Sequence, residues 1–285
     1  MKTKSSYFLT IFFISVFFVS ACCIEEIGPD VQLTDDAIID TTFIAAVETP
    51  DDKVVLIEEF TGLACPNCPA GTNVIEQIMA DNPGRVIPIA YVEGALAEHA
   101  DQNENYITTD GDAVAAFLGG TSQWPSGGVD RDSFTSQIIT GYGQWNTRVD
   151  TRLLETSPVN IDITFTLMTA DTLKILVDLR LTEVVVEEMK VSIGITESHI
   201  IDVQDSVGFD IPDYEHNHIF RDMVTSSNGE TLVAPNGVYE AGRVFQKAFK
   251  TKLGDTWTYE NLTVIAFVHS ATLKEVIQAA EIEVD

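Results

Sequence analysis

The chain between Lys53 and about residue 156 alternates short apolar runs with a stretch of helical periodicity. The runs at 54–60 and 85–94 are short and largely apolar, which is typical of buried strands. Residues 69–84 predict a helix that ends at a Pro-Gly breaker, and its apolar face consists of Val74, Ile75, Ile78 and Met79. This order of elements predicts an α/β fold.

Three further elements are predicted in the same segment. Residues 112–120 predict a short helix closed by glycine, and residues 124–131 predict a third strand. Residues 133–155 predict a longer helix, interrupted by Gly141 and Gly143, with apolar positions at Phe134, Ile138, Tyr142, Trp145, Val149 and Leu153. We interpret the aromatic side chains of this helix as core packing rather than as a ligand site.

After Ser157 the apolar period changes to two. Residues 159–168, 172–181 and 189–195 alternate apolar and polar side chains, and two apolar runs follow at 261–269 and 276–285. Short alternating strands separated by turns predict an antiparallel β-sandwich of the immunoglobulin-like type. The sequence therefore predicts an α/β domain at 51–156 and a β-sandwich domain at 157–285.

Charge limits the partners of the chain. The formal net charge is −28, and removing the first 21 residues, which carry two lysines and no acid, makes it −30. A surface this acidic repels nucleic acid and anionic membrane surfaces. We therefore expect no nucleic-acid partner and contact with a membrane only through an anchor.

The N-terminus has the features of an export signal. A basic start, an apolar run too short to span a bilayer and then small residues predict a signal peptide over 1–21. The residues Val19 to Cys22 resemble a bacterial lipobox, which implies lipidation of Cys22; an ordinary secretory signal is the alternative. By the same resemblance, Cys23 after the acceptor favours the outer membrane, on either its periplasmic or its cell-surface side. Residues 22–50 are predicted to be an acidic tether with one strand around Phe43–Val47.

With Cys22 lipidated, Cys65 and Cys68 are the natural pair in the folded part. Structural zinc would need four ligands, and no second cysteine pair is available, so no metal or other cofactor is expected. A static disulfide suits an oxidising compartment, although a disulfide that closes so short a loop stabilises the fold only slightly. A redox pair is favoured by the position after a buried strand and before a helix, where the helix N-terminus would lower the pKa of Cys65. Cys68, one turn on, could resolve a mixed disulfide.

These residues resemble the active site of the thioredoxin superfamily. In that family an acid–Phe pair lies six residues before the first cysteine, which corresponds to Glu59 and Phe60 here. The resemblance implies that Glu59 exchanges protons with the resolving thiol, and that Pro125 is a cis-proline that orients a substrate chain. Ala64 in place of a tryptophan, Pro69 after the second cysteine and an apparent insertion at 93–112 depart from the family pattern.

A second resemblance covers nearly the whole mature chain. The segments EEFTGLACPNCPAG, WPSGGVDR, YEHNHIFRDM and IAFVHSATLKEVIQA are similar to recurring segments of the outer-membrane-protein-28-related lipoproteins. This family joins a lipobox, a thioredoxin-like domain and a β-rich C-terminal part. The resemblance implies an architecture more than a reaction.

A histidine pair forms another candidate metal site. His216 and His218 would share a face in an extended strand, next to Asp213 and Glu215. We interpret this cluster instead as hydrogen bonding at a turn or strand edge, with Arg221 offsetting the local acids.

Two functions follow from the sequence. The first is a membrane-tethered enzyme for thiol–disulfide exchange on exported proteins, with Cys65 as nucleophile, Cys68 as resolving thiol, Glu59 as proton relay and Pro125 as substrate platform. Its partners would be protein thiols or disulfides. The second is a non-catalytic outer-membrane or surface lipoprotein with a structural disulfide, whose domains bind a surface protein partner or serve assembly.

Overall fold

The computed structural model describes residues 40–134, 137–169 and 171–284. The predicted signal peptide, the lipid acceptor Cys22 and the first part of the acidic tether lie outside the described residues. The end of the tether contributes strand β1 (Asp40–Ile44), three residues earlier than the predicted strand at Phe43–Val47.

The α/β segment follows the predicted order. Strand β2 (Val55–Thr61) leads through helix α1 (Cys68–Asp81) to strand β3 (Val86–Val92), and the two strands are parallel. Helix α2 (Thr109–Leu118) follows, and strand β4 (Ser126–Val129) returns antiparallel to β2. Helix α3 (Trp145–Arg152) ends the segment.

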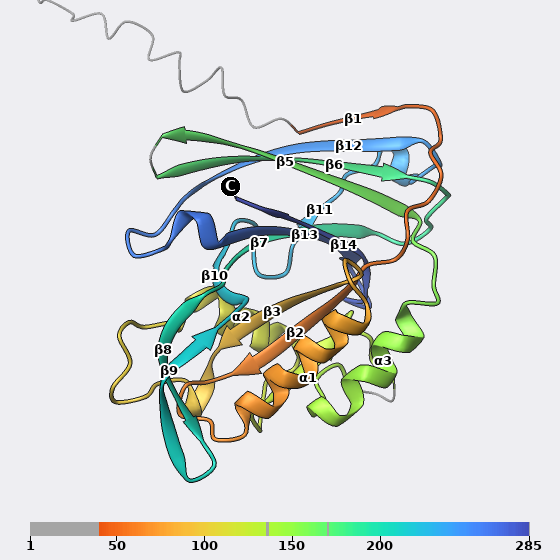
Figure 1. Ribbon diagram of the computed structural model, residues 1–285. Helices are drawn as coiled ribbons and strands as arrows, with labels where there is room; N and C mark the ends of the chain where they lie inside the picture. The colour runs from red at the N-terminus through yellow and green to blue at the C-terminus, as the bar shows by residue number, and fades with distance from the viewer. Residues whose placement is uncertain (1–39, 135–136, 170, 285) are drawn as a thin grey trace, which may run out of the picture. The chain divides into compact units, whose positions relative to one another are not determined.

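Helices cover both faces of β2 because successive side chains of a strand point to opposite faces. Val55 and Ile57 pack with apolar residues of α1 and α3, whereas Leu56 and Phe60 pack with residues of α2. Figure 1 shows α1 and α3 in front of β2 and β3, with α2 behind them. All seven residues of β2 are buried, as its apolar pattern predicts.

The rest of the described chain is rich in strands. Its strands are β5 (Val159–Thr169), β6 (Thr172–Leu181), β7 (Met189–Glu197), β8 (Ile200–Ser206), β9 (Phe209–His216), β10 (Ile219–Met223), β11 (Glu230–Thr231), β12 (Arg243–Lys252), β13 (Leu262–Ser270) and β14 (Val276–Glu283). Short 3-10 helices occur at Gly94–Leu96, Tyr142–Gln144, Pro235–Gly237 and Tyr259–Asn261.

These strands form two larger sheets and a hairpin. One antiparallel sheet has the order β1-β12-β6-β5, and its inner residues pack in one apolar cluster with those of β7 and β13 (Figure 1). Among the described strands, β8 and β9 pair only with each other. The prediction of a β-rich, sandwich-like part is confirmed at this coarse level.

The larger sheet continues from one half of the chain into the other. Its order is β14-β13-β7-β10-β3-β2-β4, with β11 on β7, and β10 lies parallel to β3 at Ile219 and Ala90. The apolar cluster around α2 accordingly contains Phe220, Phe267 and Val276 as well as Leu56 and Tyr91. The predicted boundary near residue 157 falls in the connection between α3 and β5, and the segments on either side of it share this sheet.

The predicted helix over 133–155 was too long. Of its described residues (133–134 and 137–155), only Trp145–Arg152 are α-helical, and the 3-10 turn at Tyr142–Gln144 precedes them. Upstream, Thr140 instead pairs with Gly127 at the edge of β4 through two backbone hydrogen bonds. Gly141, with an extended backbone, marks the change of conformation. Trp145 is fully buried against residues of β2 and α1, in agreement with the core interpretation.

Candidate functional site

Cys65 and Cys68 form a disulfide in the connection between β2 and α1. Both residues are buried, with exposures of 0% and 1%. Helix α1 starts at Cys68, so Cys65 lies in the turn directly before the helix. Pro69 in the first helical turn, where a backbone donor is not needed, explains this start.

Two neighbouring acids at the end of β2 have opposite environments. Glu58 faces the α2 side, where Arg131 donates to its two carboxylate oxygens over 2.7 and 2.8 Å and the Tyr91 hydroxyl donates over 3.1 Å. Glu59 faces the α1 side, is 2% exposed, and its Oε1 has no hydrogen-bond partner. Burial without a compensating partner disfavours the charged carboxylate and raises the pKa of Glu59 to about 8.

Glu59 and Pro125 meet at one point on α1. A Cβ atom added to Gly71 would lie 2.8 Å from Glu59 Oε1 and 2.8 Å from Pro125 Cγ. The helix therefore approaches the strand closely because residue 71 has no side chain. The structure thus brings Glu59, Pro125 and the helix that carries Cys68 together.

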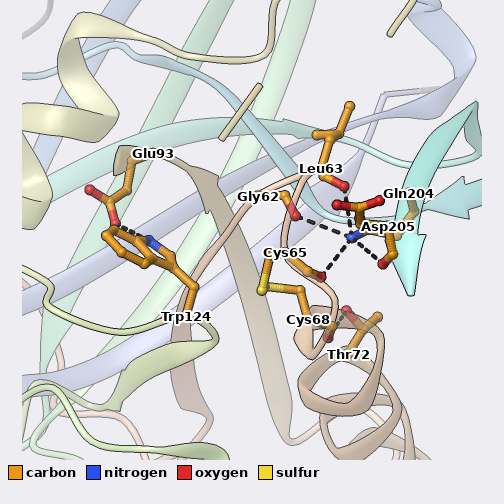
Figure 2. Close-up of a disulfide and its surroundings, with 9 residues drawn as sticks. All are labelled: Gly62, Leu63, Cys65, Cys68, Thr72, Glu93, Trp124, Gln204 and Asp205. Atoms are coloured by element: carbon orange, nitrogen blue, oxygen red, sulfur yellow. Dashed lines mark hydrogen bonds between the residues drawn. A yellow bond between two sulfur atoms is a disulfide. The ribbon is translucent and has the colours of Figure 1, made fainter. Parts of the chain in front are cut away.

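Pro125 follows Trp124 through a cis peptide bond, directly before β4. The indole N–H of Trp124 donates to Glu93 over 2.6 Å, and the Thr121 hydroxyl donates to the same carboxylate oxygen over 2.6 Å. In the view of Figure 2 the Trp124 ring lies on one side of the disulfide, and Gln204 and Asp205 lie on the other.

The β8–β9 hairpin covers the turn that carries Cys65. The Gln204 amide nitrogen lies 3.2 Å from the carbonyl oxygens of Gly62 and Leu63 and 3.1 Å from that of Cys65 (Figure 2). The Asp205 backbone N–H donates to the Leu63 carbonyl over 2.7 Å. The Gln204 amide, whose two N–H groups are shared among these carbonyls, and the Asp205 N–H hold the hairpin against the cysteine turn.

Sequence reasoning missed this cover. Gln204 lies 139 residues after Cys65 along the chain, so no local pattern links them. The available signal was the hairpin itself: residues 200–206 and 209–216 flank a Val-Gly turn, and Gly208 has a φ of 90°. That pattern predicts a hairpin but not the surface on which it packs.

The two histidines at the end of β9 do not share one face. His216 is buried and its Nε2 contacts the Val203 carbonyl over 3.2 Å, while His218 has a φ of 59°, which ends the extended conformation. Arg221 pairs with Glu197 and Glu104 at 2.7 and 2.6 Å. Within the described ranges, the cluster with metal-ligand spacing is a different one: His99, Asp205 and Asp210.

Comparison with known proteins identifies the family. Residues 114–285 match the family described as outer membrane protein Omp28, which is more than half of the chain, so this chain belongs to that family. A search of the curated proteins finds no significant match.

Two solved structures from Porphyromonas gingivalis are similar to the chain. HBP35 is 17% identical, with 84% of this chain and 77% of that chain covered and a TM-score of 0.66, which indicates a shared fold. A domain of the outer membrane lipoprotein Omp28 is 16% identical, with 45% of this chain and 89% of that chain covered and a TM-score of 0.34.

Family membership confirms the predicted location at the outer membrane. Among the described residues, no helix is both long and apolar enough to cross a membrane. Lipidation at Cys22 stays a prediction, because this residue lies outside the described ranges.

Proposed function

We propose that this protein is an outer-membrane lipoprotein whose folded part serves binding or assembly and whose Cys65–Cys68 disulfide is structural. The observation that carries this proposal is the cover over the cysteine turn. Cys65 is fully buried, and Gln204 from a distant hairpin bonds to its carbonyl and to those of Gly62 and Leu63. A thiol that attacks protein substrates must be accessible as a thiolate.

The α/β segment at 51–156 is proposed to be thioredoxin-like. Support comes from the parallel β2 and β3 joined by α1, from the cysteine pair in the connection between β2 and α1, and from Pro125 directly before β4. If so, the chain's own β8–β9 hairpin occupies the surface that binds substrate in the thioredoxin superfamily. The strand-rich segment that follows is proposed to be the sandwich that meets a protein partner at the surface.

Mild reduction followed by alkylation tests the structural role. The mature lipoprotein in detergent should keep its disulfide under reducing conditions that open exposed disulfides, and Cys65 should remain unlabelled by a maleimide in mass spectrometry. A reduction potential below about −300 mV is expected, as for other structural disulfides. The protein should neither reduce nor oxidise insulin, and Cys65→Ser should behave like the parent. Exchange activity in the parent that Cys65→Ser loses would disprove the structural role.

A second candidate function, thiol–disulfide exchange, is favoured by Glu59. This acid is buried without a partner for Oε1, its pKa is raised to about 8, and it lies beside Pro125 and α1. In this scheme a substrate thiolate attacks Cys65 Sγ and displaces the Cys68 thiolate, which takes a proton from Glu59. A second substrate thiolate then attacks the mixed disulfide and releases the Cys65 thiolate. The substrate dithiol is oxidised to a disulfide, and the cysteine pair is reduced.

A further inference from the structure

A cluster of three metal-ligating side chains lies at the tip of the hairpin that covers Cys65. His99 Nε2 is 3.6 Å from Asp205 Oδ1 and 3.8 Å from Asp210 Oδ2, and one ligand atom from each residue lies within 4.8 Å of the other two. We propose that His99, Asp205 and Asp210 bind a divalent transition-metal ion of the Zn²⁺ class, and that this ion clamps the β8–β9 hairpin over the disulfide.

The spacing and the donor set suit such an ion. Zn²⁺ binds imidazole nitrogen and carboxylate oxygen at about 2.0–2.2 Å, so the ligands of a tetrahedral site lie about 3.3–3.6 Å apart. His99 Nε2 lies 3.6 and 3.8 Å from the two carboxylate oxygens, at or just beyond this range, and side-chain rotation can close the difference. One nitrogen and two carboxylates disfavour Ca²⁺, which takes an all-oxygen shell. Asp210 is 56% exposed, so a fourth position is open to water.

The hairpin places its two carboxylates opposite each other, an arrangement that a bound cation would stabilise. Asp205 and Asp210 are direct cross-strand partners in β8–β9, next to the turn. Like charges in this arrangement destabilise a strand pair. A divalent cation between them converts the repulsion into a bridge, and His99 approaches from a different part of the chain to complete the set.

The loop that carries His99 is already held in place. Asn103 N–H donates to the Asp202 carboxylate over 2.9 Å and the Tyr106 hydroxyl donates to it over 2.6 Å, which ties this loop to β8. His99 itself is 11% exposed. Supporting contacts of this kind hold the side chains of a metal site in position.

Metal binding at Nε2 requires one change at His99. Its Nδ1 now accepts a hydrogen bond from the Asp101 N–H over 3.1 Å, which places the imidazole proton on Nε2. In the metal-bound form this proton moves to Nδ1, and the exposed Asp101 N–H turns to water.

The clamp acts on the cysteine turn because both sides of the site contact it. Asp205 donates its N–H to Leu63, while Leu96 and Ala97, close to His99, accept backbone hydrogen bonds from Ala64 and Leu63. An ion that joins Asp205 to His99 therefore stabilises the closed hairpin. Binding to the closed form alone shifts the opening equilibrium about 100-fold at a metal concentration 100 times Kd.

Zinc titration of the intact protein tests the site. The mature lipoprotein, without an affinity tag, is titrated with ZnCl₂ by calorimetry. The protein is kept oxidised so that Cys65 and Cys68 offer no thiolate ligand to the metal. Stoichiometric binding is expected, and Asp210→Asn should weaken it about tenfold or more. Asp213→Asn, which removes an exposed carboxylate from the same strand, is the matched control and should bind like the parent. Absence of binding, or equal weakening in both variants, would overturn the proposal.

The clamp has its own measurement. The rate of disulfide reduction by a phosphine is followed with and without saturating ZnCl₂, and the metal should slow reduction up to about 100-fold in the parent and in Asp213→Asn but not in Asp210→Asn. Zinc binding that leaves the reduction rate unchanged would overturn the clamp. The titration uses neither catalytic turnover nor disulfide reduction, so its outcome is independent of the test of the proposed function. The reduction rate is compared between metal-bound and metal-free protein, so it reports on the clamp whatever the absolute rate.

Discussion

At the scale of single residues, Glu58 and Glu59 show how one step along a strand changes the chemistry of a carboxylate. Strand alternation sends the two acids to opposite faces of β2. Glu58 meets Arg131 and Tyr91, while Glu59 meets Gly71 and the ring of Pro125. A buried carboxylate without a counterion destabilises the folded state whenever the carboxylate carries its charge. Under the second candidate function, this protonated acid would supply the proton that the Cys68 thiolate takes up.

This difference predicts how stability depends on pH. The pKa of Glu59 rises from an ordinary value near 4.5 to about 8 on folding, so between these values the unfolded chain releases a proton that the folded chain keeps. The contribution of Glu59 to the free energy of unfolding therefore falls as pH rises from about 4.5 to 8. Glu59→Gln removes this dependence. The free energy of unfolding of the variant, relative to that of the parent, should therefore increase by up to ~4 kcal/mol as pH rises from about 4.5 to 8.

Urea unfolding of both proteins at pH 5 and pH 8 measures the effect. Glu76→Gln, which removes an exposed carboxylate from α1, is the control. If the difference between Glu59→Gln and the parent is the same at both pH values, the buried acid is not protonated in the folded state.

At the scale of elements, the fold near the site follows from patterns that the sequence displays. The apolar run of β2, the periodicity of α1 and the spacing of Glu59, the cysteines and Pro125 all predict a strand–turn–helix unit, and the structure contains it. The β8–β9 hairpin was not predictable in its position, because its contacts with the cysteine turn join residues about 140 apart. Long-range packing of a polar amide onto carbonyls leaves no trace in hydrophobic periodicity.

The hairpin should control access to the disulfide. Gln204→Ala removes the donor that meets the carbonyls of Gly62, Leu63 and Cys65. Leaving buried acceptors unpaired costs ~1–3 kcal/mol, which corresponds to about a 5- to 150-fold increase in local opening. Reduction of Cys65–Cys68 by a phosphine, measured by trapping the thiols with a maleimide, should accelerate by about tenfold.

Gln77→Ala provides the matched comparison for this substitution. Gln77 is an exposed glutamine on α1 whose amide bonds to Asp81, so its loss should leave the reduction rate unchanged. An unchanged rate in Gln204→Ala would mean that the cover does not limit access to the disulfide.

At the scale of the whole folded part, the two halves of the sequence are joined by hydrogen bonds and by buried charge. Asp130, fully buried next to β4, pairs with Lys53 over 2.8 Å and with Arg152 over 2.9 Å. Arg152 also donates to the Val276 carbonyl of β14, and the Val276 N–H donates to the Asp130 carbonyl. Periodicity separates the chain near residue 157 because helices give way to strands there, but it carries no information on which strands pair.

The shared sheet predicts that the α/β segment does not fold alone. In a fragment of residues 51–156, the edge of β3 that pairs with β10 would be exposed, and the cluster around α2 would lose Phe220, Phe267 and Val276. The buried charges of Lys53, Asp130 and Arg152 would also lose their contacts with Val276 of β14, which adds to this loss. We expect the fragment to show no cooperative urea transition, whereas residues 38–285 should unfold in one transition that tryptophan fluorescence and far-UV circular dichroism report at the same midpoint. A sharp transition in the fragment, with a shift of tryptophan emission like that of the longer chain, would instead establish residues 51–156 as an independent domain and place its boundary where the sequence pattern changes.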